Sequence, residues 1–338
     1  MPPFGWDAYV AAHADGSPFH LGESVLVGQR SFGLPVHFLS ARHPDGRLRG
    51  VLPLVEQLLI PRTRCLVSLP FCTYGGPLVD DEPALAGLVQ AAVELAGERR
   101  ASRLVMRRSS DTPAIPWPTA LDKVSMVLPL PGTKDELAQR LGSKLRSQVR
   151  RADREKPVTV TGHAELLGDF YAVFCSVMRD LGTPVYPRRF FDAVLAALGE
   201  HALVVVIYLG DKPVSAAVLV QWHDGIEIPW AATLHAVNRL SVNMRLYWDV
   251  LQLAIDRGCS RFDFGRCTPG SGTYRFKAQW GAHPVQLYWQ AWAPDGAASA
   301  ASALGNRSKF DAAVKLWSCL PLWMTNALGP CISPRLPW

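Results

Sequence analysis

The stretch from Asp263 to Ala282 constrains the fold most, because a buried strand breaks there into a segment dense in polar and charged side chains. The apolar run at 261–264 predicts the strand, and Gly265 with Pro269-Gly-Ser-Gly272 predicts where it gives way to a loop. Glycines let backbone N–H groups approach a ligand, and cations follow within a few residues. The stretch therefore predicts the floor of a site for an anionic, phosphate-bearing molecule.

The size and composition of the chain predict a globular protein of two domains. Its 338 residues exceed the size at which one core stops growing, and 49 % are hydrophobic while 19 % are charged. The 7 cysteines contain no Cys-x-x-Cys pair, which favours reduced, mostly buried thiols in a cytoplasmic protein. The start of the sequence lacks the pattern of an export signal, and no apolar run approaches the roughly 20 residues that cross a bilayer. We therefore expect a soluble or peripheral protein.

The first part of the chain predicts an α/β (α+β) domain over residues 1–130. A turn at Pro44-Asp-Gly46 joins two strands into a hairpin. Alanine and leucine then dominate one long helix, which ends in basic residues. The expected elements are a helix at 6–13, strands at 36–42, 48–56, 64–69, 103–108 and 123–130, and a helix at 84–99.

The second part, residues 131–293, has the element order of an acyltransferase domain of the GNAT type. A helix pair is followed by three strands that form a meander, then by a long helix and two more strands. The expected helices are 164–181, 187–198 and 240–257, and the expected strands are 202–209, 213–222, 225–233, 261–264 and 285–291.

This second domain opens with a basic helix at 134–156. Thr133 and Glu136 have the spacing of a capping box, and apolar residues recur along the opposite face. From 140 to 156 there are seven Lys and Arg against two acidic residues. A bound polyanion and an ordinary solvated surface both explain this pattern. The candidate polyanion-binding residues are Lys144, Arg146, Arg150 and Arg151.

Several linked motifs carry a resemblance to a known family. They are residues 74–77, 143–152, 181–186, 262–265 and 272–277, with Trp280-Gly281. With these motifs the chain resembles the Fem-type (FemAB) acyl and aminoacyl transferases, and is most similar to the branch found beside exosortase/PEP-CTERM and exopolysaccharide genes. The resemblance implies two tandem GNAT-like domains, each with a mixed central sheet flanked by helices. It also implies transfer of an activated acyl group to an amine or hydroxyl of a cell-envelope, exopolysaccharide or peptidoglycan precursor.

The candidate catalytic residues are Lys277 and Asp263. The match of Phe276-Lys277 to the family motif implies that Lys277 contacts the phosphates of a nucleotide-linked acceptor, and its charge also suits a developing oxyanion. Asp263 orients or deprotonates an attacking amine, or else caps the end of the strand. The alternative is that Lys277 is a surface cation beside Phe276 with no role in a site. Candidate substrate-binding residues are Arg275, Arg266, Tyr274, Tyr186, Gly270, Ser271 and Gly272, of which the two tyrosines either line an acceptor groove or pack.

We expect no tightly bound cofactor, no metal and no covalent intermediate, with aminoacyl-tRNA or acyl-CoA as the activated co-substrate. Residues 233–243 contain no glycine, which disfavours ordinary CoA binding there. Cys259, Cys267 and His235 lack a pairing spacing and are expected to be core or loop residues. The expected partners are an anionic nucleotide- or lipid-linked glycan acceptor and tRNA as donor carrier. Two alternatives stay open, a CoA-dependent N- or O-acetyltransferase and a non-catalytic polyanion-binding accessory protein.

The remaining residues, 294–338, predict a small-residue linker and an aromatic tail. Apolar side chains recur at Phe310, Val314, Trp317 and Trp323 with few charges between them. Such a tail either packs on the protein or docks peripherally at the inner face of a membrane through 310–328. Packing is favoured, because Pro321 interrupts a long amphipathic helix.

Overall fold

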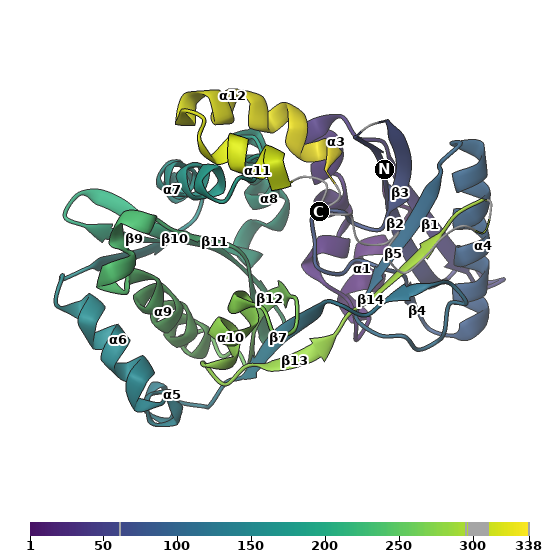
Figure 1. Ribbon diagram of the computed structural model, residues 1–338. Coiled ribbons are helices and arrows are strands. Elements are labelled where there is room, and N and C mark those ends of the chain that lie inside the picture. Colours follow the sequence, from purple (N-terminus) through teal and green to yellow (C-terminus); the bar gives the residue numbers. More distant parts are fainter. Residues whose placement is uncertain (61, 295, 297–310, 337–338) are drawn as a thin grey trace. The chain divides into compact units, whose positions relative to one another are not determined.

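The computed structural model describes residues 1–60, 62–294, 296 and 311–336, and its contacts divide them into two compact units (Figure 1). The first comprises the described residues within Met1–Val124, Gln286–Phe310 and Cys331–Trp338, and the second those within Ser125–Val285 and Asp311–Pro330. Each unit has a mixed sheet flanked by helices, which confirms the predicted α/β class. The boundaries differ from the expected limits at 130 and 293, because each sheet contains a strand from the other part of the chain.

The first unit is built on the predicted hairpin and long helix. Strand β3 runs parallel to β5, while β1, β2 and β14 pair antiparallel with their neighbours. One face of the sheet packs on α4 through apolar side chains that include Leu88 and Leu104. The strand order is β1 (Val36–Arg42), β2 (Leu48–Leu59), β3 (Thr63–Val67), β5 (Arg103–Arg108), β14 (Tyr288–Trp292), β6 (Thr119–Ala120), with β4 (Leu78–Val79) paired to β2. The helices are α1 (Trp6–Ala12), α2 (Gly22–Val25), α3 (Val27–Phe32) and α4 (Glu82–Glu98).

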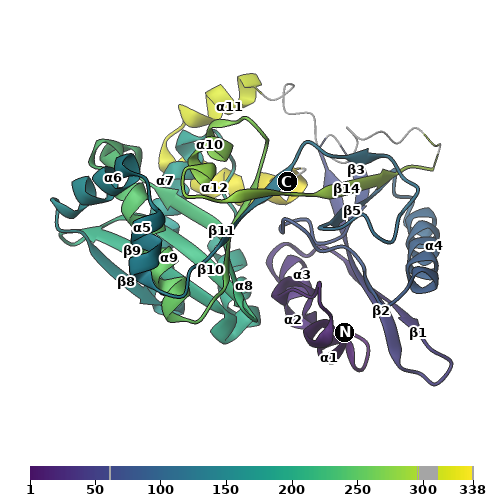
Figure 2. The ribbon, with the colours of Figure 1, turned by 90° about the horizontal axis from the view of Figure 1, so that it is seen from below.

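The second unit has a larger helical cover, with α7 and α8 on one face of its sheet and α9 on the other (Figures 1 and 2). The strand order is β13 (His283–Gln286), β7 (Val124–Pro129), β12 (Arg261–Cys267), β11 (Gly225–Thr233), β10 (Lys212–Trp222), β9 (Ala202–Leu209), β8 (Val158–Gly162). The helices are α5 (Lys134–Arg140), α6 (Ser143–Asp153), α7 (Leu167–Asp180), α8 (Arg188–Leu198), α9 (Val242–Asp256) and α10 (Gly272–Ala278). The meander β9–β10–β11 and the following helix are as predicted.

The single strand expected at 285–291 is wrong, because this segment forms two strands in different sheets. Strand β13 lies at the edge of the second sheet, whereas β14 joins the first sheet between β5 and β6. At the junction the Leu287 N–H donates to the carbonyl of Lys123 at 3.2 Å, and the Gln286 amide donates to that same carbonyl at 3.0 Å. These bonds hold the junction of β13 and β14 beside Lys123, the residue directly before β7. Strand β7 in turn leads the chain from residues of the first unit into the second sheet.

The continuous helix expected at 134–156 is also wrong, since Leu141 and Gly142 separate α5 from α6. The Thr133 cap is confirmed, because its hydroxyl accepts from the Glu136 N–H at 3.2 Å. Leu141 is extended, with ψ 133°, and its carbonyl accepts from the Arg146 guanidinium at 2.6 Å. The amphipathic pattern of α6 is confirmed: its apolar side packs toward α9, and Lys144, Arg146, Arg150 and Arg151 are exposed.

The tail forms two helices in its described part, α11 (Asp311–Ser318) and α12 (Leu322–Ile332), which Pro321 separates as predicted. Phe310 and residues 297–309 of the expected linker lie outside the described residues. Gly182 lies directly beneath Val314, and its φ of 68° together with this close approach requires glycine. In the described parts of the chain, no helix combines the length and the apolar character needed to cross a membrane.

Candidate functional site

The parallel strands β11 and β12 pair over only three residues and then part. The register runs from Gly225 opposite Arg261 to Glu227 opposite Asp263, where it ends. Strand β11 nevertheless continues to Thr233, and β12 continues to Cys267. The carboxyl ends of two neighbouring parallel strands are a usual place for ligands in α/β proteins, because helices begin there and loops diverge.

Local sequence explains why the pairing stops. Between β10 and β11 the register passes from Val218 opposite Trp230 to Val220 opposite Glu227, so β11 contains an extra residue at 228–229. Such a bulge bends its strand, and Pro229 within it has no N–H to give to a ladder. On β12, Gly265 has a φ of 74°, which an L side chain rarely adopts. Both strands therefore leave regular geometry at the same level.

Asp263 lies at this branch point with one carboxylate oxygen engaged. Its Oδ1 accepts hydrogen bonds from the Ser125 hydroxyl at 2.5 Å and from the Gly265 N–H at 2.7 Å. Among the described residues no hydrogen bond reaches Oδ2. Burial raises the pKa of Asp263, while the two hydrogen bonds and the charge of Lys277 act in the opposite direction. The result is an oriented carboxylate that binds a proton more readily than an ordinary aspartate.

Lys277 reaches the same place from α10, a helix that replaces the loop expected after Gly265. The Ser271 hydroxyl caps this helix by accepting from the Tyr274 N–H at 3.1 Å. The Lys277 ammonium, with the residue only 5 % exposed, donates to the carbonyls of Gly265 at 2.8 Å and Arg266 at 3.0 Å. Burial lowers the pKa of Lys277. The side chain assigned to a phosphate from the sequence is thus bonded to the backbone of β12, and its contact with a ligand stays a prediction.

Sequence analysis did not identify Ser125 and Glu227. Register partners of a parallel pair direct their side chains to the same face, so Glu227 on β11 lies beside Asp263 on β12. The charge of Glu227 also acts on Lys277. A lone carboxylate in the apolar run Ile226-Glu-Ile-Pro-Trp230 was a usable signal. Ser125 gave none, because it stands 138 residues from Asp263 in the chain.

The remaining predicted residues divide into two groups. One group precedes Lys277 in the segment from β12 to α10: Arg266, Gly270, Ser271, Gly272, Tyr274 and Arg275. Arg275 is exposed, and its guanidinium donates to the Gly270 carbonyl at 2.8 Å. Tyr186 instead belongs to a buried aromatic cluster, with its ring centroid 4.7 Å from that of Phe190. Tyr186 therefore packs in this cluster, and its contact with an acceptor stays a prediction.

The three other reactive residues, Cys259, Cys267 and His235, differ in their surroundings. Cys259 and Cys267 are buried, and burial raises the pKa of the Cys259 thiol, which disfavours the thiolate. His235 is exposed, with Nδ1 3.5 Å from an Asp180 carboxylate oxygen. Within the described ranges, no three His, Cys, Asp or Glu side chains gather in a way that could hold a metal ion.

Comparison with known proteins places this site inside a recognised domain. Residues 139–278 match the family model described as acetyltransferase (GNAT) domain. This span includes the Glu227–Asp263 branch point, Lys277 and the whole basic face of α6. Comparison with curated protein sequences finds no relative that matches.

Similar folds occur in solved structures at low sequence identity. The structure of FemX has a TM-score of 0.65 at 15 % identity, and the match covers 84 % of this chain and 94 % of the FemX chain. The C-terminal domain of a protein described as a lysylphosphatidylglycerol synthetase, from Agrobacterium fabrum, has a TM-score of 0.57 at 14 % identity, with coverages of 86 % and 92 %. A tandem GNAT protein from the clavulanic acid biosynthesis pathway has a TM-score of 0.53 at 11 % identity, with coverages of 87 % and 94 %.

These likenesses extend over most of the chain and therefore over both units, which confirms the predicted architecture of two tandem GNAT-like domains. Residues 139–278 thus match a GNAT-type acyltransferase domain, and the fold of the chain is similar to that of FemX.

Proposed function

We propose that the second unit transfers an activated acyl group to an amine or hydroxyl at the branch between β11 and β12. The observation that carries this proposal is the Asp263 carboxylate, held through Oδ1 while Oδ2 makes no hydrogen bond among the described residues, at the end of the parallel pairing and inside the matched acyltransferase domain. An acceptor nucleophile must lose a proton as it attacks, and a carboxylate with a raised pKa is a stronger base than an ordinary aspartate.

The chemistry follows from the donor and the carboxylate. The lone pair of the acceptor amine or hydroxyl forms a bond to the acyl carbon, and Asp263 takes the proton of the acceptor. The bond from the acyl carbon to the thiol sulfur or ribose oxygen of the donor breaks, and the leaving thiolate or alkoxide takes a proton from solvent. Ser125 and the Gly265 N–H hold the carboxylate in one orientation, and Lys277 holds the end of β12 in place. No enzyme-bound acyl intermediate is needed, because the donor is already activated and positioning supplies much of the rate.

The proposed donors are aminoacyl-tRNA and acyl-CoA. The GNAT match favours acyl-CoA, whereas the exposed cations of α6 suit the phosphate backbone of tRNA. In the described part of the chain, no ion pair involves Lys144, Arg150 or Arg151. Both donors are made in the cytoplasm, so the proposed reaction takes place there.

The proposed acceptor is a cell-envelope precursor. The fold is similar to FemX and to a protein described as a lysylphosphatidylglycerol synthetase, whose name specifies a lipid acceptor. The resemblance to the branch beside exosortase and exopolysaccharide genes adds nucleotide- or lipid-linked glycans, exopolysaccharide and peptidoglycan precursors. In this proposal Arg266, Arg275 and Tyr274 line the acceptor side.

A mass-resolved comparison of envelope polysaccharide, peptidoglycan and lipids tests the proposal. Cells that produce the wild-type protein should contain an acylated species that is missing from cells without it and from cells with Asp263→Asn. An acylated species that persists with Asp263→Asn would contradict the assignment of the base.

Calorimetry with acetyl-CoA and with charged tRNA separates the donors. Binding of acetyl-CoA alone supports the alternative CoA-dependent N- or O-acetyltransferase. Charged tRNA binding that Lys144→Gln with Arg150→Gln and Arg151→Gln weakens, with a salt dependence reduced by about one unit of slope per charge, supports the aminoacyl donor. Salt-sensitive binding without any acylated product in the cell comparison would instead identify a non-catalytic polyanion-binding protein.

A further inference from the structure

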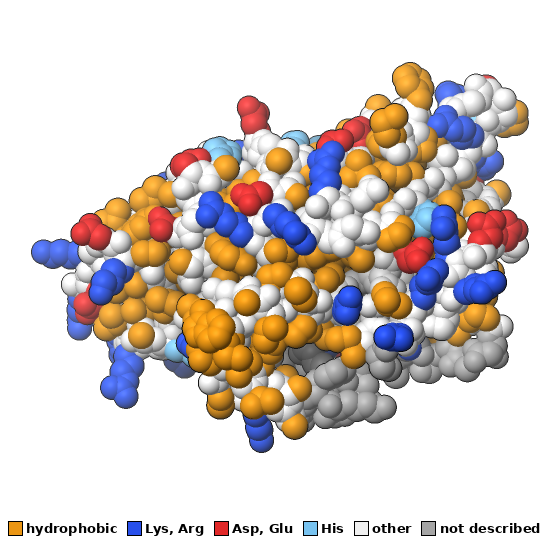
Figure 3. All heavy atoms as spheres, turned by 90° about the horizontal axis from the view of Figure 1, so that it is seen from above, with side chains coloured by type: hydrophobic (Ala, Val, Ile, Leu, Met, Phe, Trp, Pro, Cys, Tyr) orange, Lys and Arg blue, Asp and Glu red, His pale blue; other side chains and the backbone are white. Residues whose placement is uncertain are grey.

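The helices α11 and α12 expose large apolar side chains instead of burying them. In the view from above, which looks onto these two helices, apolar side chains gather on the left (Figure 3). Their exposed fractions are 40 % for Val314, 68 % for Leu316, 71 % for Trp323 and 45 % for Leu328. Leu181, 53 % exposed, adjoins Gly182, which touches Val314. We call these five side chains the tail face.

The polarity of α12 is inverted relative to a helix on an ordinary protein surface. The residues that α12 buries are small, Thr325 and Gly329, and a side chain at Gly329 would meet the Val185 backbone at 2.9 Å. Trp323 and Ala327, one turn apart, face outward. A helix on a soluble protein's surface directs apolar side chains inward and polar ones outward. An outward apolar face like this one indicates that another apolar surface covers it.

The charge and length of the tail specify what covers the face. From the start of α11 to residue 336 the chain contains one acidic residue, Asp311, and two cations, Lys315 and Arg335, so its net charge is weakly positive. Helices of 8 and 11 residues separated by Pro321 are too short to span a bilayer but can lie in its interface. An exposed tryptophan prefers that depth, where its ring is apolar and its N–H is hydrated.

We propose that the tail face docks on the surface of an anionic phospholipid bilayer. Leu316 and Trp323 enter the interface between head groups and acyl chains, and Lys315 contacts lipid phosphates. The inference does not depend on the proposed acyl transfer, because it concerns membrane binding alone. Of the two alternatives predicted from the sequence, the proposal selects peripheral docking at a membrane over packing on the protein.

Co-sedimentation of the full chain with vesicles tests the inference. Wild-type protein should bind vesicles that contain phosphatidylcholine and phosphatidylglycerol more tightly than vesicles of phosphatidylcholine alone. Leu316→Asp with Trp323→Asp should weaken this binding about 10-fold or more. The matched control is Val158→Asp, since Val158 is 57 % exposed on β8 of the same unit and lies outside the tail face; it should bind like wild type. Failure of the wild type to bind, or equal binding by the double variant, would overturn the inference.

Two further measurements keep the inference open to refutation even if the double variant folds poorly. Brominated phosphatidylglycerol should quench tryptophan fluorescence of the wild-type protein, and Trp323→Phe should reduce that quenching. Absence of quenching would overturn the proposal. Light scattering in solution examines a second copy as the occupant, and a dimer that dissociates in the double variant while vesicle binding is unchanged would assign the face to self-association and also overturn it.

Discussion

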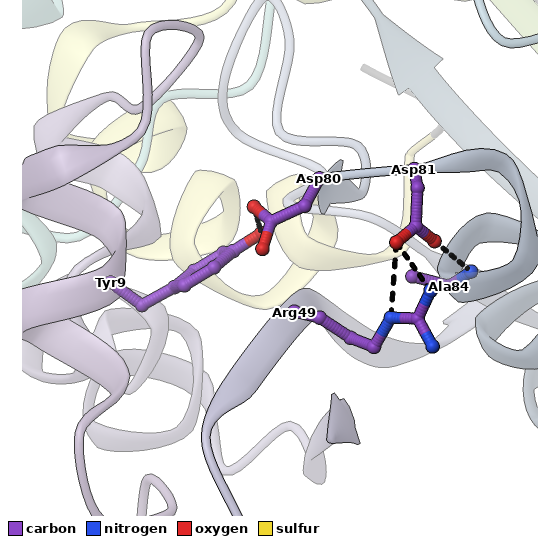
Figure 4. Close-up of polar contacts among 5 residues, drawn as sticks. All are labelled: Tyr9, Arg49, Asp80, Asp81 and Ala84. Atoms are coloured by element: carbon purple, nitrogen blue, oxygen red, sulfur yellow. Dashed lines mark hydrogen bonds and ion pairs between the residues drawn. The ribbon is translucent and has the colours of Figure 1, made fainter. Parts of the chain in front are cut away.

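Asp81, the N-cap of α4 in the first unit, and Asp263, within β12 in the second, are carboxylates whose pKa values are displaced in opposite directions. Asp81 caps α4, where Oδ1 accepts from the Ala84 N–H at 2.8 Å and Oδ2 pairs with the Arg49 guanidinium (Figure 4). The hydrogen bond from Arg49 and that from Ala84 lower the pKa of Asp81. Burial raises the pKa of Asp263, which uses one oxygen for Ser125 and Gly265.

The difference separates a carboxylate that holds the fold from one that is available for chemistry. Both oxygens of Asp81 have partners that prefer its charged form, so ionised Asp81 stabilises the folded unit. Asp263 retains an oxygen without a hydrogen bond among the described residues, and its charged form is partly desolvated. Such a group costs stability when ionised, as is expected of a carboxylate with a functional role, and the role of Asp263 as base stays a proposal.

The largest expected effect comes from Asp263→Asn. The amide oxygen can still accept from Ser125 and Gly265, so the local structure should persist while the proton acceptor is lost. We expect the acylated product to form about 10²–10⁴ times more slowly, measured as its initial rate of appearance by mass spectrometry. The control Asp81→Asn should keep the wild-type rate, and a normal rate in Asp263→Asn would end the role of Asp263 as base.

The second effect is structural and concerns Lys277→Met, which keeps the length of the side chain and removes its donors. The carbonyl of Gly265 would lose a buried hydrogen bond, and that of Arg266 a partly buried one. We expect the free energy of unfolding to fall by about 2–4 kcal/mol, measured by urea denaturation. Unchanged stability with a raised KM for the acceptor would instead support the phosphate contact implied by the family motif.

These two residues show how far sequence reasoning reaches. Asp263 and Lys277 were identifiable because charged residues stand out beside a broken apolar run and match a family motif. The meander, the Thr133 cap and the amphipathic α6 follow from local rules of periodicity and capping. The contact of Ser125 with Asp263 and the exchange of β7 and β14 between sheets depend on pairings between distant segments, which no local pattern encodes. The bulge at 228–229 is likewise a property of register with β10.

The pH dependence gives the third effect, and its sign follows from the direction of each pKa. Because the folded protein raises the pKa of Asp263, native protein binds this proton more tightly than unfolded protein does. The contribution of Asp263 to stability is therefore fully present below the unfolded pKa and is lost as pH rises through the folded pKa, by about 1.4 kcal/mol for each unit between the two values. Urea titrations at several pH values should show that Asp263→Asn removes this term.

The rate of acyl transfer should rise with pH, whereas the contribution of Asp263 to stability falls. A base must be ionised, so kcat/KM should rise with pH through a pKa above the ordinary range of aspartate. The acidic limb of the profile should disappear in Asp263→Asn. A limb that stays in place in the variant would assign it to another group.

The smallest effect is expected at Asp81, where ordinary capping and an ion pair act together. Asp81→Ala removes the acceptor for the Ala84 N–H and the partner of Arg49, and should lower the melting temperature by a few degrees at neutral pH. Because the folded protein lowers the pKa of Asp81, this stabilisation is present above the unfolded pKa and is lost as pH falls through the folded value. Calorimetry at neutral and acidic pH should therefore show the variant and the wild type converging in acid.

The neighbouring Tyr9→Phe, which removes only the hydrogen bond of 2.7 Å to Asp80, should change the melting temperature less. A difference between Asp81→Ala and wild type that grows in acid would mean that the two carboxylates are not displaced in opposite directions, and the contrast between a folding carboxylate and a functional one would fail.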